Sequence, residues 1–289
     1  MKTKAFYDER TSTLTYVSFS EEERIGVVID SVLDFDAASG RTWTESADEV
    51  SQFLEQERIN IPYVLDTHVH ADHLSAMSLF KERFDAKTVI GSDIVKVQRV
   101  FQDLFNLGDD LATNGSQFDV LMQDGEILDV GPFELEAIHT PGHTPACMSY
   151  RIEDSLFVGD ALFQPDYGTA RCDFPGGSAE ELYSSISAVY KRFPNSTRVY
   201  TCHDYQPGGR ALQFESTLQQ QRESNVQLNH STTQADFVAF RMERDATLSM
   251  PALILPSIQI NVRAGNPPRP EANGISYLKL PINAFGGQS

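Results

Sequence analysis

The chain has 289 residues, of which 40% are hydrophobic and 22% are charged, a composition typical of a globular protein with a large core. Its 41 acidic and 23 basic residues give a formal net charge of −18, which disfavours a protein that binds mainly to nucleic-acid phosphates. Small or metal-bound ligands fit this charge better. We find no apolar segment long enough to span a membrane and no secretory leader, so we expect a soluble, cytoplasmic protein without nucleic-acid or membrane partners.

Strands and helices alternate in the first part of the chain. Residues 14–19 alternate in the manner of a half-buried strand, and residues 25–29 form a continuous apolar run typical of a more buried one. Ser46 followed by Glu49 predicts a capping box at the start of a helix. Further strands are predicted at 63–66 and 88–91, and further helices at 74–83 and 94–107.

Short strands separated by turns follow, at 127–130, 133–138 and 156–158, and this pattern favours antiparallel hairpins. Ser178 and Glu181 predict a second capping box and helix. The remaining elements are a strand at 198–202, helices at about 211–227 and 233–246, and a proline-rich, extended segment from Pro251 to Ser289.

The strongest chemical signal is the segment Thr-His-Val-His-Ala-Asp-His, directly after the strand predicted at 63–66. His68 and His70 lie two residues apart, so in an extended loop they project to the same side. Asp72 and His73, at the start of the next helix, can face a neighbouring position. Together these residues form a dense cluster of metal-ligand side chains.

Three later segments end in the same residue types. His143 lies in a Pro-Gly-His turn, Asp160 follows the strand at 156–158 in Val-Gly-Asp-Ala, and His203 follows the strand at 198–202 in Cys-His-Asp-Tyr. Each polar residue stands at the end of an apolar strand, where a rigid scaffold can deliver it into a shared cleft. Four such segments in one chain favour a metal site over unrelated structural histidines.

This order of motifs resembles the metallo-β-lactamase superfamily, whose hallmarks are a His-x-His-x-Asp-His loop, a Gly-His turn, a Gly-Asp strand end and a later strand-end histidine. The resemblance covers about residues 60–205. It implies an α/β fold, a four-layer αβ/βα sandwich with the metal site at one edge of the two sheets. We expect one domain over residues 1–289, with residues 211–289 a C-terminal extension packed on it.

Within the superfamily the chain most resembles the persulfide dioxygenases, also called sulfur dioxygenases, which are iron relatives of glyoxalase II. Val69 stands where glyoxalase II enzymes typically carry a third histidine. Residues 167–174 resemble the Gly-Arg-Thr-Asp-Phe stretch of the dioxygenases, and His203-Asp204-Tyr205 matches their His-Asp-Tyr ending. The resemblance implies oxidation of glutathione persulfide by O2 to sulfite and glutathione.

The resemblance also implies that His68, His143 and Asp160 bind one Fe(II) per chain. Two histidines and one carboxylate on one face of an octahedron leave three positions for water, dioxygen and the substrate sulfur. The neighbouring side chains would then orient these ligands through hydrogen bonds, namely His70, Asp72, His73 and His203.

Two alternatives stay open. The same four neighbouring residues can complete a binuclear zinc or mixed-metal site with Asp160 as the bridge, as in a glyoxalase II-type thioester hydrolase. A non-catalytic, sulfur-responsive binding module is the third hypothesis, although structural zinc prefers closed shells with cysteine over open His/Asp clusters.

Substrate contacts are expected from Arg171 and Tyr205, which match positions where the family contacts glutathione. A guanidinium pairs well with a carboxylate, and glutathione has two. Further basic residues near the cleft are expected to admit an anionic substrate, with Arg210, Arg241 and Arg263 as candidates. The C-terminal extension is expected either to line the substrate pocket or to form a subunit interface, which leaves a homodimer open.

Overall fold

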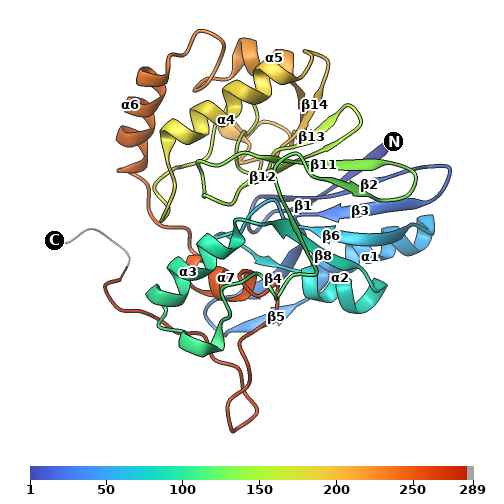
Figure 1. The fold of residues 1–289 in the computed structure, drawn as a ribbon, viewed down its shortest axis with the longest axis vertical. Helices are drawn as coiled ribbons and strands as arrows, with labels where there is room; N and C mark the ends of the chain where they lie inside the picture. Colours follow the sequence, from blue (N-terminus) through green and yellow to red (C-terminus); the bar gives the residue numbers. More distant parts are fainter. Residues whose placement is uncertain (285–289) are drawn as a thin grey trace.

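The computed structural model describes residues 1–284 and shows two six-stranded β-sheets with helices on their outer faces (Figure 1). The first sheet has the order β1 (Lys2–Asp8), β2 (Thr13–Phe19), β3 (Ile25–Ile29), β6 (Asn60–Leu65), β8 (Lys87–Gly91) and β9 (Val120–Met122). The second has the order β10 (Ile127–Asp129), β11 (Glu134–His139), β12 (Met148–Ile152), β13 (Ser155–Phe157), β14 (Arg198–Tyr200) and β15 (Glu215–Thr217). A small third sheet joins β5 (Arg41–Trp43), β4 (Val32–Asp36) and β7 (Leu74–Ser75).

The helices divide between the two outer faces (Figure 1). On the side of the first sheet lie α1 (Glu45–Glu57), α2 (Met77–Phe84), α3 (Ile94–Leu104) and α7 (Ile254–Asn261). On the side of the second sheet lie α4 (Ala179–Arg192), α5 (Leu218–Ser224) and α6 (Gln234–Asp245).

Three apolar clusters hold these layers together. Phe19 and Phe80 belong to the cluster between the first sheet and its helices, and Tyr16 and Phe157 to the cluster between the two sheets. Leu182 belongs to the third cluster, between the second sheet and its helices. Each such large side chain contributes about 1.5–3 kcal/mol when fully buried. The layers are therefore helix, sheet, sheet and helix, and the predicted four-layer αβ/βα fold is confirmed.

Strand direction brings the chain's polar strand ends to one edge. β3, β6, β8 and β9 are parallel, and in the second sheet β13 is parallel to β14. Backbone hydrogen bonds join the two sheets at this edge, from Leu14 N to Cys202 O (2.7 Å) and from Met148 N to Thr67 O (2.9 Å). The segment after β14 is therefore bonded to the first sheet, and the segment after β6 to the second.

Most predicted strands appear within one or two residues of their expected bounds, and one differs in its environment. β2 was expected to be half-buried, yet all seven of its residues are buried. Leu14 and Tyr16 point into the core between the sheets, whereas Val17 and Phe19 point toward the helices. A strand inside a four-layer sandwich is covered on both faces, which alternation alone does not reveal.

Two predicted helix starts are wrong. The Ser46–Glu49 capping box does not form: α1 begins after Thr44, and the Ser46 hydroxyl instead donates to Asp34 Oδ1 (2.7 Å). The helix expected at 74–83 begins only at Met77, because Leu74 and Ser75 pair with β4 as a short strand. By contrast, the second capping residue is confirmed, with the Ser178 hydroxyl accepting from Glu181 N.

The C-terminal part is more helical than expected. Residues 254–261 form α7 inside the segment predicted to be extended from Pro251 onward. Pro256 is tolerated because it lies in the first turn, where backbone N–H groups have no partner within the helix. The helix expected at 211–227 is shorter, since β15 precedes α5. Residues 285–289 of the predicted C-terminal extension lie outside the described residues.

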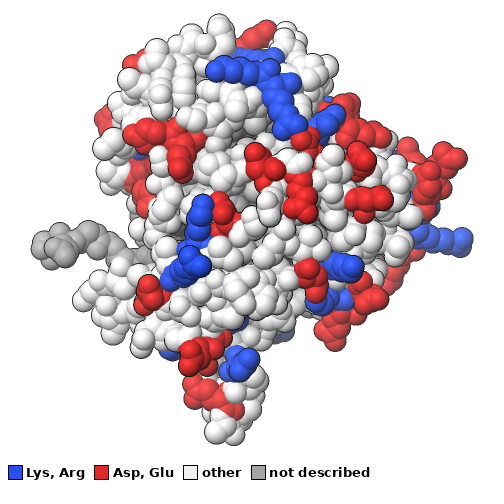
Figure 2. All heavy atoms as spheres, viewed as in Figure 1, with Lys and Arg blue, Asp and Glu red and all other residues white. Residues whose placement is uncertain are grey.

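Acidic side chains are distributed over the visible face, and the basic ones lie among them in a few separate groups (Figure 2). No helix within residues 1–284 is both long enough and apolar enough to cross a membrane.

Candidate metal centre

All seven predicted metal-site residues converge at the edge where the two sheets meet. They come from four loops, which follow β6, β11, β13 and β14. In chain order they are His68, His70, Asp72, His73, His143, Asp160 and His203. All are buried except Asp72, which is partly exposed. The prediction that separate strand ends deliver these side chains to one place therefore agrees with the structure.

The first donor group consists of two histidines and one carboxylate. Ligand atoms of His68, His143 and Asp160 lie within 4.8 Å of one another. Asp160 Oδ2 is 3.7 Å from His143 Nε2 and 4.0 Å from His68 Nε2. These distances leave room for an ion between the three donor atoms.

A second donor group lies on the other side of Asp160. His203 Nε2 is 3.4 Å from Asp160 Oδ1 and 3.2 Å from Asp72 Oδ2. His70, Asp72 and His73 form a further cluster whose ligand atoms lie within 4.8 Å of one another. Asp160 thus directs Oδ2 to the first group and Oδ1 to the second, as a carboxylate between two metal sites would.

Unpaired polar atoms show that these residues fit a cation. Within residues 1–284, five buried atoms at the centre have no hydrogen-bond partner: His70 Nδ1, Asp72 Oδ2, His73 Nε2, Asp160 Oδ1 and His203 Nε2. The contact between Asp72 and His203 is close, but it lacks the geometry of a hydrogen bond. A buried polar atom without a partner costs about 1–3 kcal/mol, a cost that a bound metal ion removes. These buried histidine nitrogens and carboxylate oxygens therefore fit a bound metal ion.

Glycines explain the Gly-His and Gly-Asp pairs in the sequence. Gly142 has φ +140°, and an added Cβ would lie 2.3 Å from the backbone N of Leu182 in α4. Gly159 has φ +53°, and an added Cβ would lie 2.5 Å from the hydroxyl of Thr67. Each glycine allows a turn and a close approach that place the following donor residue.

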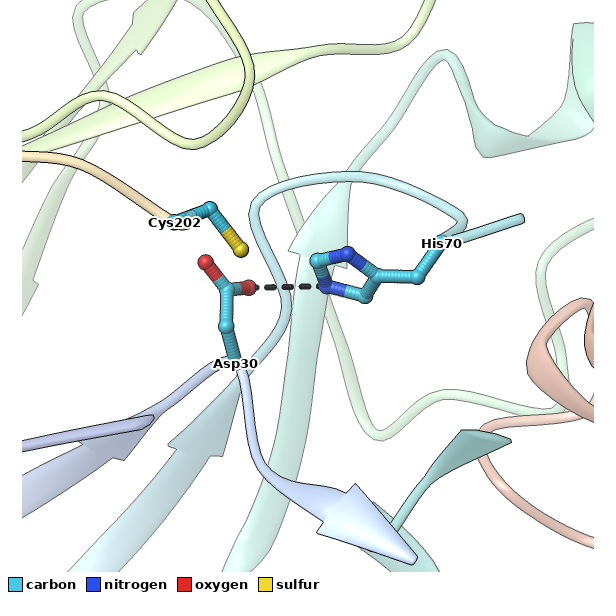
Figure 3. Close-up of side chains that lie close together, drawn as sticks. All are labelled: Asp30, His70 and Cys202. Carbon is cyan, nitrogen blue, oxygen red and sulfur yellow. Dashed lines mark hydrogen bonds and ion pairs between the residues drawn. The ribbon is translucent and has the colours of Figure 1, made fainter. Parts of the chain in front are cut away.

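A buried carboxylate below the first histidine loop organises that loop. Asp30, at the end of β3, accepts from Thr67 N (2.7 Å), and its Oδ1 lies 3.0 Å from His70 Nε2 (Figure 3). The Thr67 hydroxyl is 3.0 Å from Asp30 Oδ2 and 3.0 Å from His68 Nδ1. Its single proton goes to the carboxylate, so the hydroxyl accepts from His68 Nδ1–H. This hydrogen-bond chain leaves the Nε2 lone pair of His68 directed at the donor group.

Backbone carbonyls orient two further histidines in the same way. His143 Nδ1 lies 2.7 Å from the carbonyl oxygen of Arg171, and His203 Nδ1 lies 3.1 Å from that of Ser12. Donation from Nδ1 leaves Nε2 unprotonated in a neutral imidazole. Both rings therefore direct Nε2 toward the centre, and Nε2 carries a free lone pair when the imidazole is neutral.

Burial and neighbouring charges shift the pKa values of these groups in opposite directions. Burial lowers the pKa of His68 and of His70 well below the usual range, so both rings are neutral at pH 7. Burial also disfavours the charged form of His203, but the carboxylates of Asp72 and Asp160 raise its pKa above the ordinary value. The second group, without a metal, therefore attracts a proton to His203.

An open cavity of about 470 Å³ adjoins the centre. Asp72, His143 and Asp160 form one part of its wall, and Phe163 and Phe174 give it apolar surface. The open side of the first donor group therefore faces a space large enough for a small peptide.

Both predicted substrate-contact residues line this cavity. Tyr205 is 42% exposed and stacks on His203, with ring centroids 5.6 Å apart. Arg171 is less available, because its guanidinium holds both carboxylate oxygens of Asp173 (2.6 and 2.7 Å) and donates to Ser249 O (2.7 Å). The substrate roles of Arg171 and Tyr205 stay predictions.

The other basic candidates differ from one another in position. Arg241 lines the cavity, but Arg210 and Arg263 do not. Arg210 instead pairs with Asp204 (2.7 Å) and with Asp166 (2.5 Å). The expectation that these arginines lie near the cleft is thus correct for Arg241 and wrong for the other two.

Sequence reasoning missed Asp30 and Thr67, which the structure places directly beneath the histidine loop. A signal for Asp30 was present, because it is a polar residue at the end of the apolar strand at 25–29, the same pattern that identified Asp160 and His203. Thr67 carries no comparable signal, since a threonine after a strand is common.

Known proteins share this fold and are similar to the chain over most of its length. The chain is 49% identical, over 99% of its length and 100% of the relative, to a probable metallo-hydrolase of Burkholderia pseudomallei. It is 29% identical, over 91% of its length and 88% of the relative, to the mitochondrial persulfide dioxygenase ETHE1 of Bos taurus. The crystal structure of ETHE1 from Myxococcus xanthus matches with a TM-score of 0.73 at 28% identity, covering 92% of this chain and 100% of that one.

The family assignment rests on the match of residues 14–203 to the metallo-β-lactamase superfamily. That span contains all seven donor residues. The resemblance found in the motifs is therefore confirmed, and the chain belongs to the metallo-β-lactamase superfamily, with persulfide dioxygenases among its relatives.

Proposed function

We propose that the protein is an iron-dependent persulfide dioxygenase that oxidises glutathione persulfide with O2 and water to sulfite and glutathione. One observation carries this proposal. His68, His143 and Asp160 form a group of two histidines and one carboxylate whose open side faces the cavity of about 470 Å³. Such a triad is characteristic of non-haem iron sites that bind dioxygen and a substrate together.

Similarity to a named enzyme supports the same activity. The persulfide dioxygenase of Bos taurus shares 29% identity with the chain over most of both proteins. The Myxococcus xanthus structure covers 92% of the chain, so the similarity is not confined to the donor loops.

In this proposal His68, His143 and Asp160 hold one Fe(II) per chain. Bound to these three side chains, iron would supply the means to bring dioxygen and the persulfide sulfur together. The chain's own contribution is orientation: Thr67 and the carbonyl of Arg171 fix the rings of His68 and His143 through their Nδ1 atoms. Because these side chains are already held in place, metal binding costs less conformational entropy than it would with mobile side chains.

The cavity walls supply the remaining functions. Phe163 and Phe174 exclude water from the side of the donor group, and Tyr205 presents a phenol at the rim. Arg171 shapes the wall, because its bonds to Asp173 and Ser249 connect the loop after β13 to the segment after α6. A persulfide peptide bound here would place its sulfur toward the centre and its polar groups toward the rim.

A second candidate function is thioester hydrolysis at a binuclear zinc or mixed-metal site. The observation that favours it is the second donor group, in which His203 Nε2 lies 3.2 Å from Asp72 Oδ2 and 3.4 Å from Asp160 Oδ1. The relative from Burkholderia pseudomallei is described as a probable metallo-hydrolase. In this reading Asp72, Asp160 and His203 would hold a second metal ion beside the first donor group, and the two metals would supply an activated water for hydrolysis of a thioester.

Oxygen consumption separates the two functions. Anaerobically purified, iron-loaded protein is mixed with glutathione persulfide, and oxygen uptake and sulfite are measured in the same sample. Uptake proportional to iron content and equal to the sulfite formed supports the dioxygenase. Absence of uptake together with hydrolysis of S-lactoylglutathione, at two metals per chain, refutes it and supports the hydrolase. Stoichiometric binding without either turnover would indicate a sulfur-responsive binding module.

Two histidine variants give the matched control. His143→Gln removes a donor that lines the cavity and is expected to lose iron and oxygen uptake together. His230→Gln changes an exposed histidine outside the cavity, whose Nδ1 lies 2.9 Å from Arg222 O, and is expected to keep both. Full iron content and activity in the His143 variant would contradict the ligand assignment.

A further inference from the structure

Four arginines line the cavity beside the metal centre, and they differ in what their guanidinium groups already bind. They are Arg10, Arg171, Arg241 and Arg244. The cavity wall also carries the carboxylates of Asp72 and Asp160, and the whole chain has a net charge of −18. An anionic substrate therefore needs at least one cation in the cavity that no protein carboxylate has neutralised.

Two of the four arginines are neutralised at the cavity wall. Arg10 forms ion pairs with Asp34 (2.5 Å) and Asp8 (3.0 Å). The two carboxylate oxygens of Asp173 occupy the guanidinium of Arg171, the residue that the family resemblance suggested for substrate binding. A bidentate pair of this kind leaves little capacity for a second carboxylate.

The third arginine is neutralised inside the protein. Arg241 is buried on α6 and pairs with Asp245 one turn later. It also donates to Gln227 Oε1 (3.0 Å) and to the carbonyl of Thr169 (3.3 Å). Asp245 in turn accepts from the backbone N of Cys172 (2.9 Å). These contacts fix the end of α6 against the loop at residues 169–172, which forms part of the cavity wall.

Arg244 is the exception. It is exposed at the cavity, and its guanidinium has no hydrogen bond or ion pair with any residue of the part of the chain that the structure describes. Arg241 and Arg244 are three residues apart, so they lie on neighbouring positions of one helix face. Because the contacts of Arg241 and Asp245 fix this end of α6, the backbone that carries Arg244 has a defined position at the cavity.

We propose that Arg244 binds a carboxylate of the substrate, and that the substrate is a persulfide peptide with a free carboxylate. The inference rests on the proposed function and adds the residue that selects the thiol carrier. The sulfur would lie against the wall formed by His143 and Asp160, and the carboxylate against the wall formed by Arg244 and its neighbour Leu248. The C-terminal segment thereby supplies the specificity of a centre built by the rest of the chain.

Replacement of Arg244 by glutamine tests the proposal through its effect on KM. A hydrogen bond to a charged group contributes enough that its loss is expected to raise KM for glutathione persulfide about 10–100-fold. Iron content and kcat are expected to stay within about twofold of the wild-type values, because Arg244 contacts none of the donor residues. The matched control is Arg99→Gln, which alters an exposed arginine of α3 that lies outside the cavity and likewise has no partner within residues 1–284.

A modified substrate identifies the group that Arg244 contacts. The persulfide of glutathione diethyl ester has both carboxylates masked. The wild-type protein is expected to use it with a raised KM, and the Arg244→Gln variant is expected to show no further increase. An unchanged KM for glutathione persulfide in the variant, or an equal effect of the substitution on the acid and the diester, would overturn the proposal.

Binding of glutathione itself separates this inference from the proposed function. Calorimetric titration of metal-loaded protein with glutathione needs neither oxygen nor turnover. If the wild-type protein consumes no oxygen but binds glutathione at least tenfold more tightly than Arg244→Gln, the dioxygenase proposal fails and the role of Arg244 stands. If the wild-type protein binds no glutathione, or both proteins bind it equally, the role of Arg244 is refuted.

Discussion

Replacement of Thr67 by valine is the most direct test of how the chain orients its first histidine. The hydroxyl of Thr67 donates to Asp30 Oδ2 (3.0 Å) and accepts from His68 Nδ1 (3.0 Å). Valine keeps the branched shape and fills nearly the same volume, but it offers neither a donor nor an acceptor. The substitution therefore removes one hydrogen-bond link and little else.

The size of the effect follows from what each partner retains. Asp30 keeps two partners, the backbone N of Thr67 at 2.7 Å and His70 Nε2 at 3.0 Å. His68 Nδ1 keeps none within residues 1–284, because Thr67 is its one hydrogen-bond partner there. A buried donor left unsatisfied costs about 1–3 kcal/mol of folding stability. Loss of such a supporting hydrogen bond lowers metal affinity about 10–100-fold.

Competition with a chromophoric chelator measures the affinity for Fe(II) or Co(II), and urea denaturation of the metal-free protein measures the stability. Thr67→Ser is the matched control, because serine restores the hydroxyl and loses one methyl group. We expect wild-type affinity in the serine variant and weakened affinity in the valine variant. Equal metal affinity in all three proteins would show that His68 is not a ligand or that Thr67 does not orient it.

Further outcomes follow from the same structure. Gly142→Ala should destabilise the protein by about 3 kcal/mol or more and lower its metal content, because the new Cβ would lie 2.3 Å from Leu182 N at φ +140°. Gly40→Ala, where φ is +66° but no atom lies within 4 Å, should cost about 1 kcal/mol, so similar melting temperatures for the two variants would contradict the clash. Asp245→Ala should cost about 3–5 kcal/mol in urea denaturation because it leaves the buried charge of Arg241 unpaired, and the double change Arg241→Met with Asp245→Leu should recover most of that loss. Addition of metal at about 100 times its Kd should raise the free energy of unfolding by about 2.7 kcal/mol, an increase that a chelator abolishes; an unchanged unfolding transition would mean that the donor groups bind no metal.

Local sequence determined the elements that carry the centre. Alternating or continuous apolar residues predict strands because side chains follow the pleat, and this rule located β2, β3, β6 and β8. The polar residues after β6, β11, β13 and β14 were recognisable because a buried strand seldom ends in histidine or aspartate without a reason. His68, His143, Asp160 and His203 were therefore assignable to one centre before any coordinates were known.

Secondary structure that depends on distant partners was less predictable. Leu74 and Ser75 have the apolar and polar pattern of a helix start, yet they form a strand because β4 lies beside them. α7 forms despite its proline because the first turn of a helix needs no backbone N–H donor. The pairing of Leu74 and Ser75 with β4 does not follow from residues within one helical turn of them.

The sequence by itself determined the fold class, the superfamily and the set of polar residues that converge at one centre, because each depends on short patterns at the ends of strands. Only the tertiary structure decided which charges are free. Arg171 is neutralised by Asp173 and bonded to Ser249, and Arg241 is neutralised by Asp245, whereas the guanidinium of Arg244 has no partner within residues 1–284. The physical reason is that an ion pair depends on a distance of a few ångströms between side chains, and residues 171 and 249 approach each other only after the layers have packed.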